Sequence, residues 1–304
     1  MRLGFIGLGS MGLAMAEHLQ RGGYDLHLWA RRVASTNSLV ERGATLCDTP
    51  AALAQACDIV CTNVTSSADV ELLALGANGL LEGFRPGALH IDFSTIAPQT
   101  ARQIAASYSR RNVDFVDAPV SGGSNAARAA SLAIMWGSRD DGSGALAARL
   151  KPIFDCIAKT VVHVGASGAG QVAKACNQMV MVAAIEAAAE AACLARASNL
   201  DLAKVFQAIG AGSAGSRVLE VFGARMLKRD FAVGVEARLH HKDFGLLLGE
   251  AVRLGAPLPI AASVMQQLNA LMAQGGAKND TSALLKVLER ASTQSAAIAD
   301  CAAR

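Results

Sequence analysis

The first half of the chain alternates short apolar runs with helical patterns. Runs of four or five residues that are rich in Val, Ile and Leu predict buried strands, and the segments between them carry apolar residues at helical spacing. This alternation favours a parallel sheet covered by helices. The predicted strands are Leu3–Ile6, Leu26–Trp29, Ile59–Asn63, Ala88–Asp92 and Val113–Asp117.

The second half of the chain lacks such runs from Gly168 onward, and its Ala- and Leu-rich stretches predict helices only. Residues 171–197 contain almost no helix breaker, so one long helix is expected to lead out of the sheet domain. Further helices are predicted at 216–228, 237–254, 260–273 and 281–291. We therefore expect an α/β domain over residues 1–165 and an all-α domain over 166–304, joined by the long helix.

Composition and charge exclude several classes of protein. The 304 residues suffice for two cores, and 52% hydrophobic with 17% charged residues excludes disorder. A net charge of +3 without long basic runs gives no support for binding nucleic acid or a membrane surface. No uninterrupted apolar segment reaches the roughly 18 to 20 residues that span a bilayer. We expect a soluble, cytoplasmic protein.

The cysteines predict no metal site. There are seven, with no C-x-x-C pair and no His at ligand spacing, which favours free thiols in a reducing compartment. The adjacent pair His240-His241 is predicted to lie on a helix, where neighbouring side chains point in different directions.

A glycine-rich turn follows the first predicted strand. Gly7-x-Gly9-x-x-Gly12 lies directly before the helical pattern Met11–Gln20, which is the context that dinucleotide binding needs. Glycines permit close approach of the backbone to a pyrophosphate, and the helix N-terminus offers unpaired N–H groups. The sequence therefore predicts a Rossmann-type domain with a cofactor-binding turn made of Gly7, Leu8, Gly9, Ser10, Met11 and Gly12.

The end of the second strand indicates the choice of cofactor. NAD-selective folds usually carry an acid here for the ribose 2′-hydroxyl, and Ala30 cannot serve. Arg31 or Arg32 could instead pair with a 2′-phosphate. NADP(H) is favoured and NAD remains possible; the alternative is that both arginines are solvated surface residues.

Three separated signatures occur in order along the chain: Gly4-Phe-Ile-Gly-Leu-Gly-Ser-Met-Gly12, Asp117-Ala-Pro-Val-Ser-Gly-Gly123 and Gly170-Gln-Val-Ala-Lys-Ala-Cys-Asn177. With Leu239-His-His-Lys-Asp243, they resemble the β-hydroxyacid dehydrogenase family over nearly the whole chain. The resemblance implies that Lys174 transfers the proton, and that Lys242 approaches the cofactor.

The resemblance also implies a substrate site. Ser121, Gly122 and Gly123 follow a strand end and could bind a carboxylate through a hydroxyl and unobstructed N–H groups, although Ser-Gly-Gly is often only a turn. Asn177 and Gln178 share a helical face with Lys174. Many members carry Asn where this chain has Gln178, so both amides are candidates for orienting the substrate.

The sequence differs from the usual family pattern at two further places, and four of its residues resemble family contacts to the cofactor. Ala130-Ser131 stands where Gly-Thr is common, and His18 where Asn is common. Thr95 could alternatively cap the helix predicted from Pro98. The residues that resemble family contacts to the cofactor's ribose and nicotinamide are Asn63, Val64, Thr65 and Thr95.

Two further stretches narrow the expected activity. Ser213–Glu220 and Met226–Phe231 are similar to the tartronate semialdehyde (2-hydroxy-3-oxopropionate) reductases within the family. Neighbouring branches are 3-hydroxyisobutyrate dehydrogenases and glyoxylate/succinic semialdehyde reductases. A non-catalytic dinucleotide-binding module and an imine reductase are alternatives, and the presence of Lys174 argues against both. The resemblance implies a small carboxylate substrate and a homodimer or homotetramer.

Overall fold

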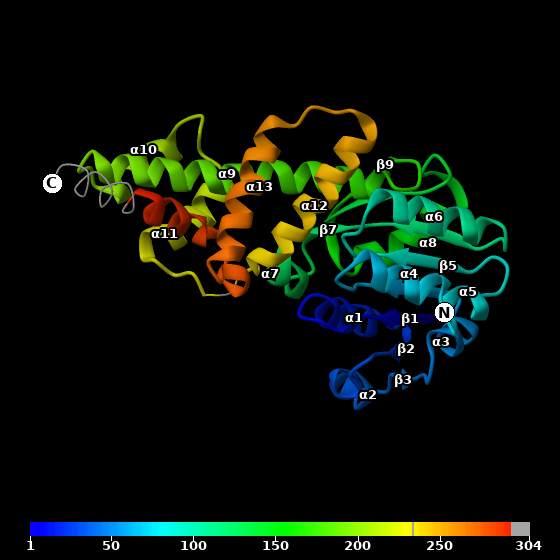
Figure 1. Ribbon diagram of the computed structural model, residues 1–304. Coiled ribbons are helices and arrows are strands. Elements are labelled where there is room, and N and C mark those ends of the chain that lie inside the picture. Colours follow the sequence, from blue (N-terminus) through cyan, green and yellow to red (C-terminus); the bar gives the residue numbers. More distant parts are fainter. Residues whose placement is uncertain (233, 293–304) are drawn as a thin grey trace. The chain divides into compact units, whose positions relative to one another are not determined.

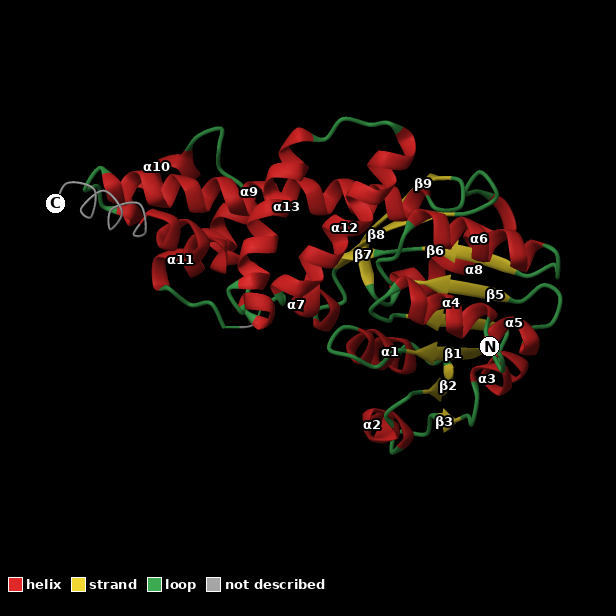
Figure 2. Cartoon of the chain, viewed as in Figure 1, coloured by secondary structure: helices red, strands yellow, loops and turns green. Residues whose placement is uncertain are grey.

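The computed structural model describes residues 1–232 and 234–292. The chain divides into two compact units, Met1–Lys174 and a second that begins at Ala175. The division falls inside one continuous helix, α9 (Ala169–Ala197), and therefore lies beyond the predicted domain boundary at residue 165. All the strands in Figure 2 belong to the first unit, and the second is helical.

The sheet of the first unit is built around six parallel strands in the order β3-β2-β1-β4-β5-β6. Figure 1 labels β3, β2, β1 and β5 of this series. This is the order of a doubly wound dinucleotide-binding fold, and ligands bind at the carboxyl ends of the strands where the order reverses, here between β1 and β4. The five predicted strands are confirmed. The bounds are β1 (Arg2–Ile6), β2 (Asp25–Trp29), β3 (Thr45–Leu46), β4 (Ile59–Thr62), β5 (Leu89–Asp92) and β6 (Asp114–Asp117).

Three more strands extend the sheet beyond β6, and the hydrophobic pattern did not predict them. β7 (Val120–Ser121) and β6 pair antiparallel with β8 (Leu132–Gly137), which pairs parallel with β9 (Ala158–Gly165). β8 contains Leu, Ala and Met, which favour helix over strand, and β7 has only two residues. The pairing of Ser121 with Ala133 fixes where the Ser-Gly-Gly segment leaves the sheet.

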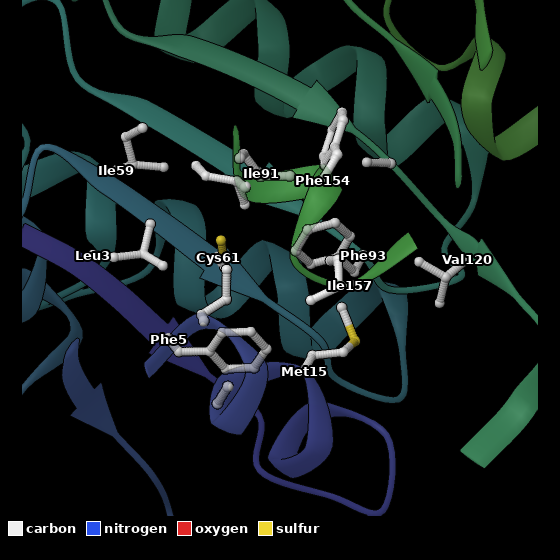
Figure 3. Packing of buried hydrophobic residues seen from close by; sticks show 14 of the residues in the cluster. Leu3, Phe5, Met15, Ile59, Cys61, Ile91, Phe93, Val120, Phe154 and Ile157 are labelled. Carbon is white, nitrogen blue, oxygen red and sulfur yellow. The ribbon is translucent and has the colours of Figure 1, made fainter. Parts of the chain in front are cut away.

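Each face of the sheet has its own hydrophobic core because successive strand residues point to opposite sides. Along β4, Ile59 and Cys61 pack into one core and Val60 into the other, all fully buried. Figure 3 shows the first core, in which Met15 and Phe154 meet the strands. The helices that supply the first core are α1 (Gly12–Arg21), α2 (Asn37–Val40), α7 (Gly123–Arg128) and α8 (Gly144–Asp155). Those that supply the second are α3 (Pro50–Ala56), α4 (Ser67–Leu75), α5 (Leu80–Gly83) and α6 (Pro98–Ser109).

The second unit packs helices around a core of alanine, aliphatic, methionine and phenylalanine side chains. The predicted helices at 237–254 and 260–273 are found, whereas α10 was not predicted although Asp201 caps it by accepting from the Ala203 N–H. The predicted helix at 281–291 begins as a 3₁₀ turn and is α-helical over 284–292. The helices are the later part of α9, α10 (Leu202–Ala211), α11 (Ala224–Lys228), α12 (Ala237–Leu254) and α13 (Pro259–Ala273), with a π-helical segment at Leu219–Gly223.

By length and composition alone α9 is a candidate membrane span, although it is not the uninterrupted apolar segment that the sequence expectation considered. The expectation counted only uninterrupted apolar residues, and polar residues such as Lys174 and Glu186 interrupt this helix. One such helix is weak evidence, because the core helix of a globular protein passes the same test. Val182, Ile185 and Ala189 are fully buried in the core of the second unit.

Candidate active site

The glycine-rich turn joins β1 to α1, and two of its glycines are required by close backbone packing. Gly7 has a φ of +99°, and a Cβ there would lie 2.2 Å from the Asn63 carbonyl oxygen. A Cβ on Gly12 would lie 1.9 Å from the Gly7 carbonyl oxygen. Gly9 differs, since a Cβ there would meet nothing within 4 Å. The turn thus leaves open space beside Gly9, as a cradle for a pyrophosphate requires.

The other residues of this turn divide between core and surface. The Leu8 side chain is buried in the core, so only its backbone can face a ligand. Ser10 is exposed and Met11 half-buried at the N-terminus of α1. The turn therefore presents mainly backbone N–H groups, which suits an anion.

Arg31 and Arg32 are both exposed just after β2. Arg31 forms an ion pair with Asp69 of α4 at 3.2 Å, and its side chain is 75% exposed. Exposed ion pairs contribute only about 0–1 kcal/mol. Arg31 can therefore turn to a phosphate at little cost.

The loops after β4 and β5 are tied to each other. The Val64 N–H donates to Ser94 Oγ at 2.8 Å, and the Ser94 N–H donates to Asp92 Oδ1 at 3.2 Å. These bonds hold Asn63–Thr65 beside Thr95, so the structure brings together four of the predicted cofactor contacts. The N-cap residue of α6 is Ala97, so Thr95 lies two residues before the position that would cap this helix.

A buried polar chain supports these loops from inside the first unit. Thr62 Oγ1 donates to Asp92 Oδ1 at 2.7 Å and lies 2.9 Å from His90 Nε2, while His90 Nδ1 lies 3.2 Å from the Tyr108 hydroxyl. Because the Thr62 hydroxyl gives its one proton to Asp92, His90 must donate from Nε2 and accept from Tyr108 at Nδ1. Burial lowers the pKa of His90 to about 3, so the ring is neutral. Sequence reasoning missed this chain.

The Ser121–Gly123 segment leaves β7 and enters α7. Gly122 has a φ of +128°, and a Cβ there would lie 2.4 Å from the Ala126 Cβ, whereas Gly123 borders open space. Ser124 Oγ donates to Ser10 Oγ at 3.2 Å, so this segment adjoins the glycine-rich turn. The first unit thus holds the predicted carboxylate loop next to the predicted pyrophosphate site.

The N-terminus of α9 is fixed against the end of β6 by Asp117. Its Oδ1 accepts from the Gly168 N–H at 2.7 Å and its Oδ2 from the Gln171 N–H at 3.0 Å. Burial raises the pKa of this carboxyl to about 7, and the two N–H bonds act in the opposite direction. Lys174 follows in the next turn and is only 7% exposed. Asp117 begins the sequence signature Asp117–Gly123, but the sequence did not reveal that its carboxylate caps α9.

In the second unit, Gln178 bonds directly to Asn177 and contacts the same carboxylate, Asp243, as Lys242 does. Gln178 Nε2 donates to Asp243 Oδ2 at 2.6 Å, and Gln178 Oε1 accepts from Asn177 Nδ2 at 2.9 Å. Lys242 Nζ lies 3.0 Å from Asp243 Oδ1. The carboxamide of Gln178 is therefore bonded at both ends and nearly buried, whereas Asn177 is half-buried.

Histidine and cysteine side chains serve packing or local bonds. His240 Nδ1 lies 2.6 Å from Thr281 Oγ1 and His241 Nε2 lies 2.8 Å from Asn269 Oδ1, so the pair diverges. Within residues 1–232 and 234–292, no group of three or more His, Cys, Asp or Glu could hold a metal ion. Six cysteines are free thiols, and Cys301 lies outside the described residues.

Comparison with known proteins identifies the family. Residues 2–166 match the model of the NAD binding domain of 6-phosphogluconate dehydrogenase, and residues 168–288 match that of the NAD-binding region of NADP-dependent 3-hydroxyisobutyrate dehydrogenase. The 2-hydroxy-3-oxopropionate reductase of Escherichia coli K12 is 38% identical, over 95% of this chain and 97% of that protein. The probable mitochondrial 3-hydroxyisobutyrate dehydrogenase-like 1 of Arabidopsis thaliana is 36% identical, over 95% and 85%.

A solved structure agrees with these relatives. The 3-hydroxyisobutyrate dehydrogenase of Mycobacterium tuberculosis, determined with L-serine, matches 95% of this chain and 99% of its own with a TM-score of 0.86 and 29% identity. Fold, motifs and both family models agree over most of the chain. It belongs to the β-hydroxyacid dehydrogenase family and is an NAD(P)-dependent oxidoreductase.

Proposed function

We propose that the chain reduces tartronate semialdehyde (2-hydroxy-3-oxopropionate) to glycerate with NADPH, and that Lys174 donates the proton. The similarity to the reductase of E. coli over nearly the full length of both chains supports this substrate. The observation that carries the mechanism is a buried lysine in a helix whose first turn is bonded to strand ends of the dinucleotide-binding unit.

NADPH, when bound, supplies a hydride to the aldehyde carbon of the substrate. The carbonyl oxygen then gains negative charge, which the Lys174 ammonium stabilises and neutralises by giving up one proton from Nζ. In the oxidative direction the neutral amine accepts the proton of the hydroxyl. The product has gained one hydride and one proton, as reduction of an aldehyde to an alcohol requires.

The substrate is held by its acid end and by an amide. We assign the carboxylate to the Ser121 hydroxyl and the N–H groups of Gly122 and Gly123, since the space beside Gly123 is open. We assign the orienting amide to Asn177, because Gln178 is already bonded to Asp243 and to Asn177. Gln178 then positions Asn177.

The cofactor contacts follow from the first unit. The turn from Gly7 to Gly12 binds the pyrophosphate, and Arg31 with Arg32 binds the 2′-phosphate. Asn63, Val64, Thr65 and Thr95 contact the ribose and nicotinamide. For Lys242, a residue of the second unit, the approach to the cofactor rests on the family resemblance alone. Open space beside Gly9 and the exposure of both arginines support these assignments.

A second candidate function is the oxidation of 3-hydroxyisobutyrate, supported by the Arabidopsis relative and the M. tuberculosis structure. A substrate panel separates the two candidates: tartronate, methylmalonate and succinic semialdehydes and glyoxylate, each reduced with NADPH and with NADH. We expect the highest kcat/KM for tartronate semialdehyde with NADPH. A higher kcat/KM for methylmalonate semialdehyde would transfer the assignment to 3-hydroxyisobutyrate.

We further propose that the protein is a cytoplasmic homodimer or homotetramer whose helical domain, from residue 166, serves the substrate and the association of subunits. Light scattering after size exclusion measures the assembly. A monomer at micromolar concentration with full activity would overturn this.

A further inference from the structure

We propose that Gln171 is a positioning residue for hydride and proton transfer, which holds the loop Ser94–Ile96 and the helix turn before Lys174 at a fixed separation. This inference rests on the function proposed above for Lys174 and Thr95. It concerns the first unit alone.

The side chain of Gln171 pairs with the backbone on both sides of Thr95. Its Nε2 donates to the Ser94 carbonyl oxygen at 2.9 Å, and its Oε1 accepts from the Ile96 N–H at 3.0 Å. The residue is 2% exposed. A carboxamide carries a donor and an acceptor side by side, as a peptide group does, and an ionised carboxylate has only acceptors.

The backbone of the same residue is tied elsewhere. The Gln171 N–H donates to Asp117 Oδ2 at 3.0 Å at the end of β6. Residue 171 is therefore a junction between the end of β6, the loop after β5 and helix α9. Lys174 lies three residues on, and residues at this spacing share a helix face about 4.5 Å apart along the axis.

The loop keeps other supports when the Gln171 side chain is changed. The Ser94 N–H and hydroxyl bond to Asp92 and Val64, and the Ala97 N–H donates to Ser67 Oγ at 2.9 Å. Removing the Gln171 carboxamide thus leaves the loop folded but releases its tie to α9. The expected consequence is a changed distance between Thr95 and Lys174 rather than loss of the domain.

Gln171→Met tests the inference, because methionine has a similar length and no amide. Displacing a reacting group by about 1 Å can cost up to about 100-fold in rate. We expect kcat to fall by about 10- to 100-fold while the NADPH Kd, from fluorescence titration, changes less than about threefold. The matched control is Gln20→Met, since Gln20 Nε2 also donates to backbone carbonyls, of Leu39 and Arg42, at the far end of α1. The control is expected to keep wild-type kcat.

Gln171→Glu supplies a second measurement, the pH dependence of kcat, which a purely structural role of Gln171 would leave unchanged. A protonated glutamic acid can donate to the Ser94 carbonyl and accept from Ile96, whereas the ionised form faces that carbonyl with a negative oxygen. The ratio of variant to wild-type kcat is therefore expected to rise as pH falls through the titration of the buried carboxyl. This measurement also decides the matter if Gln171→Met fails to fold.

The outcomes are distinct. Wild-type kcat in Gln171→Met, a loss equal to that of Gln20→Met, or a pH-independent ratio for Gln171→Glu would overturn the positioning role. If any of these outcomes is found while Lys174→Ala is inactive, only the positioning role of Gln171 is overturned and the proposed function stands. Activity retained in Lys174→Ala would instead overturn the proposed function.

Discussion

Substituting Gly9 with Ala is expected to separate cofactor binding from folding. A Cβ at Gly9 meets no atom within 4 Å, and the residue does not have the positive φ that strains other residues. Glycine-to-alanine changes at such positions stabilise by about 0.4–1 kcal/mol through the unfolded chain. The free energy of unfolding without cofactor is therefore expected to stay level or rise. The new methyl group fills the space left for the pyrophosphate, so we expect the NADPH Kd to rise at least about tenfold.

The magnitude follows from linkage. At a concentration of 100 times the wild-type Kd, NADPH stabilises the wild type by about 2.7 kcal/mol, and a tenfold weaker Kd reduces this to about 1.4 kcal/mol. Urea unfolding with and without NADPH measures both quantities. Gly7→Ala is the contrasting variant, because its φ of +99° and the 2.2 Å approach to Asn63 predict unfolding without cofactor. An unchanged NADPH Kd in Gly9→Ala would refute the assignment of the turn.

Four further predictions address the remaining groups. Lys174→Ala and Lys174→Arg are both expected to lower kcat by about 10²- to 10⁴-fold with NADPH binding retained. Arginine cannot replace the lysine because a guanidinium keeps the charge but releases no proton. If Lys174→Arg keeps more than about a tenth of wild-type kcat, the proton-donor role passes to another group, with Lys242 the first candidate. Arg31→Ala with Arg32→Ala is expected to weaken NADPH but not NADH, and equal effects in titrations of both cofactors would contradict the 2′-phosphate site. Gly123→Val is expected to lower kcat/KM for acids with cofactor affinity retained, and its free energy of unfolding is measured as well because Gly123 has a φ of +66°; the same loss on an uncharged aldehyde analogue would argue against carboxylate binding. The pKa of Asp117 is raised from 3.8 to about 7, so its contribution to stability is present below about pH 4 and is lost as pH rises through 7. The free energy of unfolding in urea is therefore expected to be higher at pH 5 than at pH 8 in wild type, and this difference is expected to be absent in Asp117→Asn.

The central strands were predictable because they are buried on both faces. β1 and β4 are mostly apolar runs, which is the signature of a parallel strand covered by helices on both sides, and β5 is equally buried although it contains His90 and Asp92. β9 does contain the β-branched run Thr160-Val-Val-His-Val164, which favours a strand, so the sequence analysis missed a signal that was present even though these side chains are half-buried or exposed. β7 was invisible for another reason: its two residues form a strand only because β8 lies alongside.

The candidate site was predictable where a residue belongs to a motif of fixed spacing. The glycines, Ser121 and Lys174 all lie in such motifs. The residues that hold them in place lie far apart along the chain, as Gln171 and Ser94 do, and become partners only through strand order and helix placement. A pattern of residues within one segment of the sequence gives no information on such distant partners.

The helix α9 explains why the lysine motif and the dinucleotide turn occur together. Its first turn is bonded to Asp117 and, through Gln171, to the loop after β5, so the position of Lys174 relative to the cofactor loops is set within the first unit. Later residues of the helix, such as Ile185, are core residues of the second unit. Changes in the second unit can therefore occur while the position of Lys174 relative to the cofactor loops of the first unit is kept. If these bonds serve the hydride and proton transfer as proposed, relatives with names that refer to different substrates are predicted to share the bonds around Asp117 and Gln171, because that step is common to all of them.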